Sequence, residues 1–276
     1  MGRNEEPAVP RPLDREDVLA WLRSEYAHPF VGWDFSHVWG NRVVERDVEP
    51  WIYEDECITR IRGCRSVIDL GTGDGMRFSE LLERAGRPTV TRATEGYPPN
   101  LTLARNTLEP LGVEVMETTT SLPTADRSAD LIIDRHTAFD AAEVFRVLTP
   151  GGTFVVEQIG RETFREIHEA LGAPWPRAGT PQSGTCSGTS VTLAGVREAA
   201  QTAGLVVDRL EEAMLRRFFL DVGALVWYLK AIPFEVPDFD VDRYADRLVQ
   251  LHHDVERDGP LDTGFHKIFL VAHRPG

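Results

Sequence analysis

Apolar positions follow different periods in different parts of the chain. Residues 15–27 place apolar side chains along one side of a helix that begins after Asp14, a suitable N-cap. From residue 65 onward, short apolar runs of strand length alternate with helical patterns. We predict strands at 66–70, 89–94, 113–116, 130–134 and 153–157, and helices at 77–85, 101–108 and 141–148. This alternation predicts βαβ units and a parallel sheet.

The pattern is less regular outside this central region. Trp51–Ile61 predicts a second helix ahead of it, and a Pro-, Gly- and Ser-rich stretch at 174–190 predicts a loop. The later elements that we expect are helices at 191–203, 219–231 and 241–255, and strands at 205–212 and 266–273. The first 12 residues are rich in proline and charge and have no apolar segment of the secretory type.

These patterns predict three parts. Residues 1–12 form a disordered leader, residues 13–62 an N-terminal helical cap, and residues 63–276 a sheet-containing core. A chain of 276 residues has room for one such core and its helical additions.

Composition narrows the possible partners and compartment. The net charge is −14 and no basic run is present, which favours a small molecule over a nucleic acid, whose phosphates attract Lys and Arg. No run of about 20 apolar residues predicts a membrane span. Cys57, Cys64 and Cys186 have neither CxxC spacing nor a His at ligand spacing, so we expect free thiols and a cytoplasmic location. The sequence leaves the oligomeric state open.

No metal site is predicted. The chain has no HExxH motif and no carboxylate cluster with ligand spacing. His252 and His253 are expected to lie on the solvated face of their helix.

A glycine-rich turn follows the strand at 66–70. The sequence Gly71-Thr72-Gly73-Asp74-Gly75 leads directly into a helix, and a strand–turn–helix of this kind is where a nucleotide meets the edge of a sheet. Glycine allows the sharp turn and the close approach of the backbone to a ligand. The alternative is a tight turn that binds nothing. The spacing is GxGxG, which differs from the GxGxxG of dinucleotide sites and disfavours an NAD-dependent oxidoreductase.

Two carboxylates flank this turn. Asp69 lies at the end of the strand, where it attracts a ligand ammonium and repels a pyrophosphate. Glu95 closes the next strand, where its two oxygens can accept from both ribose hydroxyls. S-adenosylmethionine (SAM) has an amino acid, a sulfonium and a ribose but no phosphate, so it fits both positions.

With these residues in place, Val67–Gly75 resembles the first motif of class I SAM-dependent methyltransferases. Glu95 resembles their ribose-binding acid, and residues 130–134 and 143–156 resemble their fourth strand, the following helix and their fifth strand. The resemblance is close over about residues 60–160. The flanking segments resemble a narrower group of uncharacterised bacterial methyltransferases of the small-molecule type.

The resemblance implies an α/β, Rossmann-like fold with a seven-stranded sheet. Its order is 3-2-1-4-5-7-6, with strand 7 (266–273) antiparallel. A helical insertion at about 219–258, between the last two strands, is expected to form a wall of the substrate pocket.

The resemblance also implies the cofactor site. The expected SAM contacts are Tyr53, Asp69, Gly71, Thr72, Gly73, Gly75, Glu95, Gly96, Tyr97 and Arg135. Adenine is expected to contact Glu117 or Thr118, or the backbone around Ser121 and Leu122. For Arg135 the alternatives are a substrate carboxylate and a simple ion pair with Asp134, and we favour the ion pair.

The reacting groups are expected at the end of the fourth strand. His136 has the ordinary pKa of a general base near neutral pH; the alternatives are a wall of the cofactor pocket, which we favour somewhat over the base, and a cap of the following helix. The aromatic residues proposed to enclose the substrate are Trp33, Phe35, Trp227 and Tyr228, and ordinary packing is the alternative for each. The predicted reaction is in-line methyl transfer to O, N or C of a small metabolite. The alternatives are a SAM-binding protein without transferase activity and an RNA methyltransferase.

Overall fold

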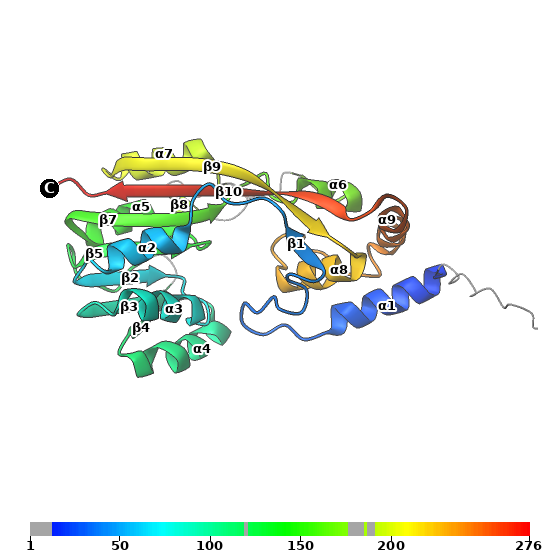
Figure 1. Ribbon diagram of the computed structural model, residues 1–276, viewed down its shortest axis with the longest axis horizontal. Helices are drawn as coiled ribbons and strands as arrows, with labels where there is room; N and C mark the ends of the chain where they lie inside the picture. Colours follow the sequence, from blue (N-terminus) through cyan, green and yellow to red (C-terminus); the bar gives the residue numbers. More distant parts are fainter. Residues whose placement is uncertain (1–12, 119–120, 176–184, 187–190) are drawn as a thin grey trace, which may run out of the picture.

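The computed structural model describes residues 13–118, 121–175, 185–186 and 191–276. Its centre is an eight-stranded mixed sheet with the order β1-β9-β10-β7-β5-β2-β3-β4 (Figure 1). The strands of this sheet are β1 (Val43–Glu45), β2 (Ser66–Leu70), β3 (Val90–Glu95), β4 (Glu114–Glu117), β5 (Ala129–Arg135), β7 (Leu148–Ile159), β9 (Val206–Phe219) and β10 (Leu261–His273). A second, two-stranded sheet pairs β6 (Phe139–Asp140) with β8 (Thr185–Cys186).

The central strands run parallel, and the C-terminal strand runs against them. β4, β3, β2, β5 and β7 pair in parallel, whereas β10 is antiparallel to both β7 and β9. The prediction of seven strands in the order 3-2-1-4-5-7-6 was inexact, because the sheet has an eighth strand. This strand, β1, pairs with the end of β9, and the other seven strands follow one another in the stated sequence. With three residues, β1 is too short to produce a recognisable alternation.

Helices cover both faces of the sheet. The helices are α1 (Arg15–Ala27), α2 (Tyr53–Ile61), α3 (Met76–Ala85), α4 (Pro98–Leu108), α5 (Ala141–Val147), α6 (Arg165–Leu171), α7 (Leu193–Thr202), α8 (Val222–Ala231) and α9 (Ala245–Asp258), with a 3₁₀ turn at Glu109–Leu111. One core lies under α2, α3 and α4, and another lies under α5 and α7. All five residues of β2 are buried because successive side chains enter these two cores in turn, which explains its continuous apolar run.

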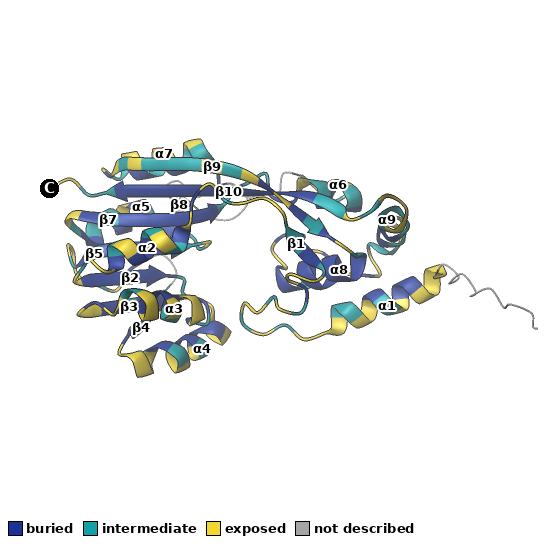
Figure 2. Ribbon diagram, in the orientation of Figure 1, coloured by how far each residue is buried: buried dark blue, intermediate teal, exposed yellow. Residues whose placement is uncertain are grey.

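A third core lies beyond the end of the parallel sheet. The strands β9 and β10 extend past the other strands and carry α6, α8 and α9, with α1 packed alongside (Figure 1). Helix α8 is apolar on all sides because neighbouring elements surround it, and Figure 2 shows it as a buried helix beside the exposed outer face of α1. Of these helices, α8 and α9 form the expected insertion between the last two strands. The predicted N-terminal cap is not wholly helical, since it contributes β1 to the sheet.

Most local predictions agree with the structure. The Asp14 carboxylate accepts from the backbone N–H groups of Glu16 and Asp17, each at 3.1 Å, as expected for the N-cap of α1. The late strands were predicted too short, and α6 was not predicted. The prediction of a solvated His252 was wrong, because its side chain is buried between helices. The leader and most of the 174–190 loop lie outside the described residues. Within the described part of the chain, every helix is too short or too polar to cross a membrane.

Candidate functional site

The glycine-rich turn lies where β2 ends and α3 begins, at the carboxyl edge of the parallel sheet. Gly71, Gly73 and Gly75 have φ angles of 60°, 66° and 82°, in the left-handed region that favours glycine. A Cβ on Gly71 would lie 2.4 Å from Oγ1 of Thr137, which belongs to the segment after β5. The turn is therefore packed directly against the residues that follow His136.

Glu95 connects this turn to the end of β3. Its Oε2 accepts from the N–H of Gly73 at 2.8 Å, and its Oε1 accepts from the N–H groups of Gly96 and Tyr97 at 2.8 and 2.7 Å. A carboxylate has about four lone-pair sites, so Oε2 keeps one for a further donor. Glu95 is 7% exposed, and it holds the backbone of the turn.

Beside the turn, several buried polar atoms have no hydrogen-bond partner among the described residues. They are Oδ2 of Asp134 and the hydroxyl oxygens of Tyr53 and Thr72, which lie near the Cys57 thiol and the Asp69 carboxyl, respectively, without meeting hydrogen-bond geometry. Buried polar groups are nearly always hydrogen-bonded, and each one left without a partner costs about 1–3 kcal/mol. Three such atoms from three different elements indicate a place where a polar ligand completes the structure.

Two carboxyl groups give this place its electrostatic character. Burial raises the pKa of Asp69 to about 7, and the nearby charge of Glu95 adds to the rise. Burial also raises the pKa of Asp134 well above its ordinary value, and the charge of Asp69 acts in the same direction. A ligand with a positive charge would favour the ionised form of both groups. The site therefore suits a cation that also has hydrogen-bonding groups.

The residues expected at adenine lie at the end of β4 and beyond it. Glu117 is exposed, and the N–H of Thr118 donates to the carbonyl of Glu95 at 3.2 Å. The Thr118 hydroxyl donates to the carbonyl of Ser121. The N–H of Leu122 already donates to Oε2 of Glu143 at 3.0 Å, so it is not open to a ligand in this arrangement.

A buried charge network lies beside the turn, centred on Glu157 of β7. The Glu157 side chain has no exposed surface, and it accepts from Nε1 of Trp51 at 2.8 Å and from Nζ of Lys267 at 3.2 Å. Nε of Arg135 donates to the same carboxylate at 3.1 Å. The predicted pairing of Arg135 with Asp134 was wrong, because successive residues of a strand point to opposite faces and Glu157 lies on the face of Arg135. Arg135 also faces the ring of Tyr53 at 5.9 Å.

His136 is held by the same carboxylate. Its Nε2 lies 3.1 Å from Oε1 of Glu157, and its backbone has a φ of 66°. Burial opposes ionisation of Glu157, yet the hydrogen bond from His136 and the charges of Lys267 and Arg135 hold its pKa well below the ordinary value. An ionised carboxylate only accepts, so Nε2 carries the ring proton and Nδ1 is left as an acceptor.

The protonation of His136 differs from the sequence expectation. Burial of the ring lowers its pKa to about 4, against the opposing effect of Glu157. The imidazole is therefore neutral at pH 7. Its side chain keeps 28% of its surface exposed.

The four predicted substrate residues belong to one aromatic cluster. Trp33 stacks against Phe35, and Phe35 packs against Trp227 and Tyr228, with ring centroids 6.2, 6.1 and 5.2 Å apart. Trp227 and Tyr228 are buried, whereas Trp33 is 46% exposed. Trp33 also covers the glycine turn, since a Cβ on Gly73 would lie 2.9 Å from its ring. The cluster joins α8 to the site.

Sequence reasoning missed Glu157 and Lys267. A signal was present in both cases. Glu157 is the charged last residue of the otherwise apolar strand predicted at 153–157, and Lys267, one of two lysines, lies in a long apolar run. Charged residues are almost never fully buried unless they are paired. Their partners come from segments about 110 residues away, so the pairing itself had no local signature.

The comparisons with known proteins agree with this geometry. Residues 68–156 match a family described as a methyltransferase domain. No curated protein matches the chain. The solved structure of YcgJ from Bacillus subtilis is similar, with 17% identity and a TM-score of 0.54 over 81% of this chain and 98% of that one. The structure of the [4+2]-cyclase SpnF is also similar, with 16% identity and a TM-score of 0.51 over 94% of this chain and 93% of that one. A functionally unknown protein from Deinococcus radiodurans R1 is similar with 15% identity and a TM-score of 0.52, over 94% of this chain and 98% of that one.

At these identities the solved structures show the fold alone. The fold is the mixed sheet of the class I type, and residues 68–156 within it form a methyltransferase domain. The chain therefore contains a methyltransferase domain, and such a domain implies a methyl donor of the SAM type.

Proposed function

We propose that this chain transfers a methyl group from SAM to an O, N or C atom of a small metabolite. The observation that supports it most is the group of unpartnered buried polar atoms, Tyr53 Oη, Thr72 Oγ1 and Asp134 Oδ2, beside the glycine turn. These atoms belong to, or lie against, the methyltransferase domain. They fit a ligand that combines a positive charge with several donors and acceptors.

Different residues of the site would bind different groups of SAM. Asp69 and Asp134 would meet the ammonium, and the remaining lone pair on Oε2 of Glu95 would accept from a ribose hydroxyl. Tyr53 and Thr72 would donate to the carboxylate. When bound, SAM supplies an activated methyl group on a sulfonium, and the protein supplies orientation and proton transfer.

His136 is the proposed general base. Its Nδ1 carries no proton and can accept one from the nucleophile, while its Nε2–H stays on Glu157. A base oriented by a carboxylate gains stabilisation as it becomes charged, which compensates for its low resting pKa. Thr137, the next residue, contacts Gly71, so the base lies directly beside the cofactor turn.

The aromatic cluster is the proposed wall of the acceptor pocket. Trp33 bridges the glycine turn and the buried rings of α8, so an acceptor between them would lie against aromatic faces. Such a wall suits a small, partly apolar molecule. The net charge of −14 also disfavours RNA, which would require a basic surface and salt-sensitive binding.

A second candidate is a SAM-binding protein that carries out a different reaction. It is favoured by one observation, the similarity in fold to SpnF, a [4+2]-cyclase. Both functions predict SAM binding, so calorimetry alone does not separate them. Formation of S-adenosylhomocysteine with a metabolite pool does, because only loss of the methyl group converts SAM into S-adenosylhomocysteine.

The proposal is tested by purifying the chain and following S-adenosylhomocysteine formation with fractionated metabolites. His136→Ala is expected to slow turnover by about 10²–10⁴-fold with little change in SAM affinity. His273→Ala is the matched control, since His273 pairs with Asp208 at the C-terminal end of β10, beside Thr153 and away from the carboxyl edge of the parallel strands. Equal loss of SAM affinity and turnover in His136→Ala would make His136 a pocket wall. SAM binding without turnover across broad pools would favour the second candidate.

A further inference from the structure

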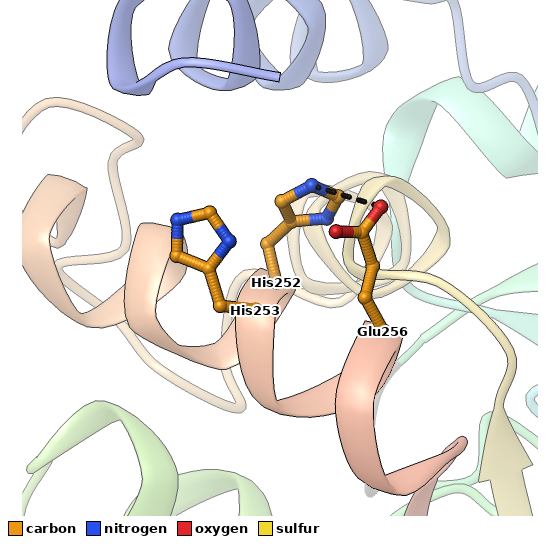
Figure 3. Close-up of side chains that lie close together, drawn as sticks. All are labelled: His252, His253 and Glu256. Carbon is orange, nitrogen blue, oxygen red and sulfur yellow. Dashed lines mark ion pairs between the residues drawn. The ribbon is translucent and has the colours of Figure 1, made fainter. Parts of the chain in front are cut away.

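Helix α9 carries three side chains with the chemistry of metal ligands on one side. They are His252, His253 and Glu256, and one ligand atom from each lies within 4.8 Å of the other two. Figure 3 shows His252 between the other two side chains, all three extending from the same helix. Residues four apart lie one above the other on a helix face, which places His252 and Glu256 in register.

His252 is the buried member of this group. Its side chain is 8% exposed, and its ring meets the ring of Trp21 of α1 edge-on, with centroids 5.6 Å apart. Its Nε2 is enclosed, with no hydrogen-bond partner in the part of the chain that the structure describes. The nearest carboxylate oxygen, Oε1 of Glu256, is 3.5 Å away, which is too long for a good hydrogen bond. A buried, unpaired nitrogen is costly, so the structure favours an additional partner there.

The 3.5 Å separation is that expected of two ligands on one metal ion. Zn–N bonds of about 2.05 Å and Zn–O bonds of about 2.0–2.2 Å at a tetrahedral angle put neighbouring ligand atoms ~3.3 Å apart. His253 is half-buried, and its ligand nitrogen lies within 4.8 Å of the ligand atoms of the other two residues. A water molecule would complete the tetrahedron.

The charges around the group leave Glu256 available. Its neighbour Arg257 pairs instead with Asp254 and Asp258, at 2.7 Å each. Glu256 is 52% exposed, so an ion can reach it from solvent. One carboxylate and two neutral imidazoles form a ligand set that zinc accepts.

We propose that helix α9 binds Zn²⁺ through His252, His253 and Glu256. The ion would fix the His252 ring against Trp21, and so strengthen the packing of α9 on α1. Zinc binding would then stabilise the folded chain, because a site assembled by packing exists only in the folded state. This site is separate from the glycine turn and does not depend on the proposed methyl transfer.

The experiment uses the untagged full chain, stripped of metal, with ZnCl₂ as the probe in titration calorimetry and thermal unfolding. One Zn²⁺ per chain is expected, with an increase in melting temperature. His253→Ala and Glu256→Gln, both at accessible positions, should each weaken binding by roughly tenfold or more. His273→Ala should bind zinc as the wild type does.

Cobalt distinguishes this site from the cysteines. Co²⁺ in place of zinc should give visible d–d bands without the thiolate charge-transfer band that binding to Cys64 would produce. The proposal is overturned if the wild type shows no saturable zinc binding. It is also overturned if either variant binds zinc like the wild type, or if the cobalt spectrum has a thiolate band.

Discussion

The raised pKa of Asp69 makes SAM affinity depend on pH in a defined direction. The carboxyl titrates near pH 7 in the ligand-free chain, and only its ionised form attracts an ammonium. The ionised fraction is about 0.09 at pH 6 and about 0.9 at pH 8, and apparent affinity scales with the fraction of the competent form. SAM should therefore bind about tenfold more tightly at pH 8 than at pH 6.

Titration calorimetry at several pH values from about 5.5 to 8 measures this dependence. Asp69→Asn should bind SAM at least about tenfold more weakly at pH 8, and its affinity should be nearly flat over this range. Asp258→Asn, at the exposed end of α9, should behave like the wild type. A wild-type affinity that does not change between pH 6 and 8, or an Asp69→Asn variant with the same slope, would refute the assignment of Asp69 to the ammonium.

In the ligand-free protein, Asp69 makes stability fall as pH rises, whereas it makes SAM affinity increase with pH. Its folded pKa lies above the unfolded value, so its contribution to stability is present at low pH and is lost as pH rises through 7. Between about pH 5.5 and 8 this loss is ~2 kcal/mol. The melting temperature of Asp69→Asn relative to the wild type should therefore be several degrees higher at pH 8 than at pH 5.5. No change in that difference would contradict the buried state of Asp69.

Three further substitutions test other parts of the site. Glu95→Ala should weaken SAM binding by at least about tenfold, because the glycine turn loses the carboxylate that accepts from Gly73. Glu114→Ala, an exposed carboxylate on the neighbouring strand, should leave SAM binding unchanged. Titration calorimetry measures both affinities. Glu157→Gln should lower the free energy of unfolding in urea by about 3 kcal/mol, since buried cations lose their compensating charge, and a loss near zero would contradict the network. Gly71→Ala should lower the free energy of unfolding by roughly 1–3 kcal/mol more than Gly86→Ala does. Both glycines have a positive φ, but only at Gly71 would the added Cβ meet a side chain. Equal losses of stability in the two variants would contradict tight packing of the turn.

The features predicted best from the sequence are those set by residues close together in the chain. The strand 66–70 and the turn 71–75 lie where the pattern placed them, because a buried apolar run and closely spaced glycines are local signals. The aromatic residues 33, 35, 227 and 228 were each predicted to enclose the substrate, and the structure packs their rings together. About 190 residues separate the two pairs, so no local pattern predicted this contact, and their role toward a substrate stays a prediction.

What the sequence did not predict depends on segments that meet only in the fold. Glu157 is the centre of the charge network because it accepts hydrogen bonds from Trp51, just before α2, and from Lys267 of β10. His252 was expected in solvent, yet its spacing from Leu248 and Leu251 places it on the buried face of α9. A helical pattern read with the histidine counted as apolar would have corrected this. The strand β1 is visible only through its partner β9.

The long strands β9 and β10 have a consequence for how the molecule opens. β10 pairs with β7 over Lys267–His273 and with β9 along its whole length, so one hydrogen-bonded ribbon runs through the parallel sheet and the helical insertion. Amide hydrogen exchange should be slowest along this ribbon and should report a single cooperative unit rather than two. The insertion cannot swing as an independent body without breaking that ladder. The connection between α1 and β1 carries Trp33, which lies against the glycine turn, and we expect its amides to exchange faster than those of either strand.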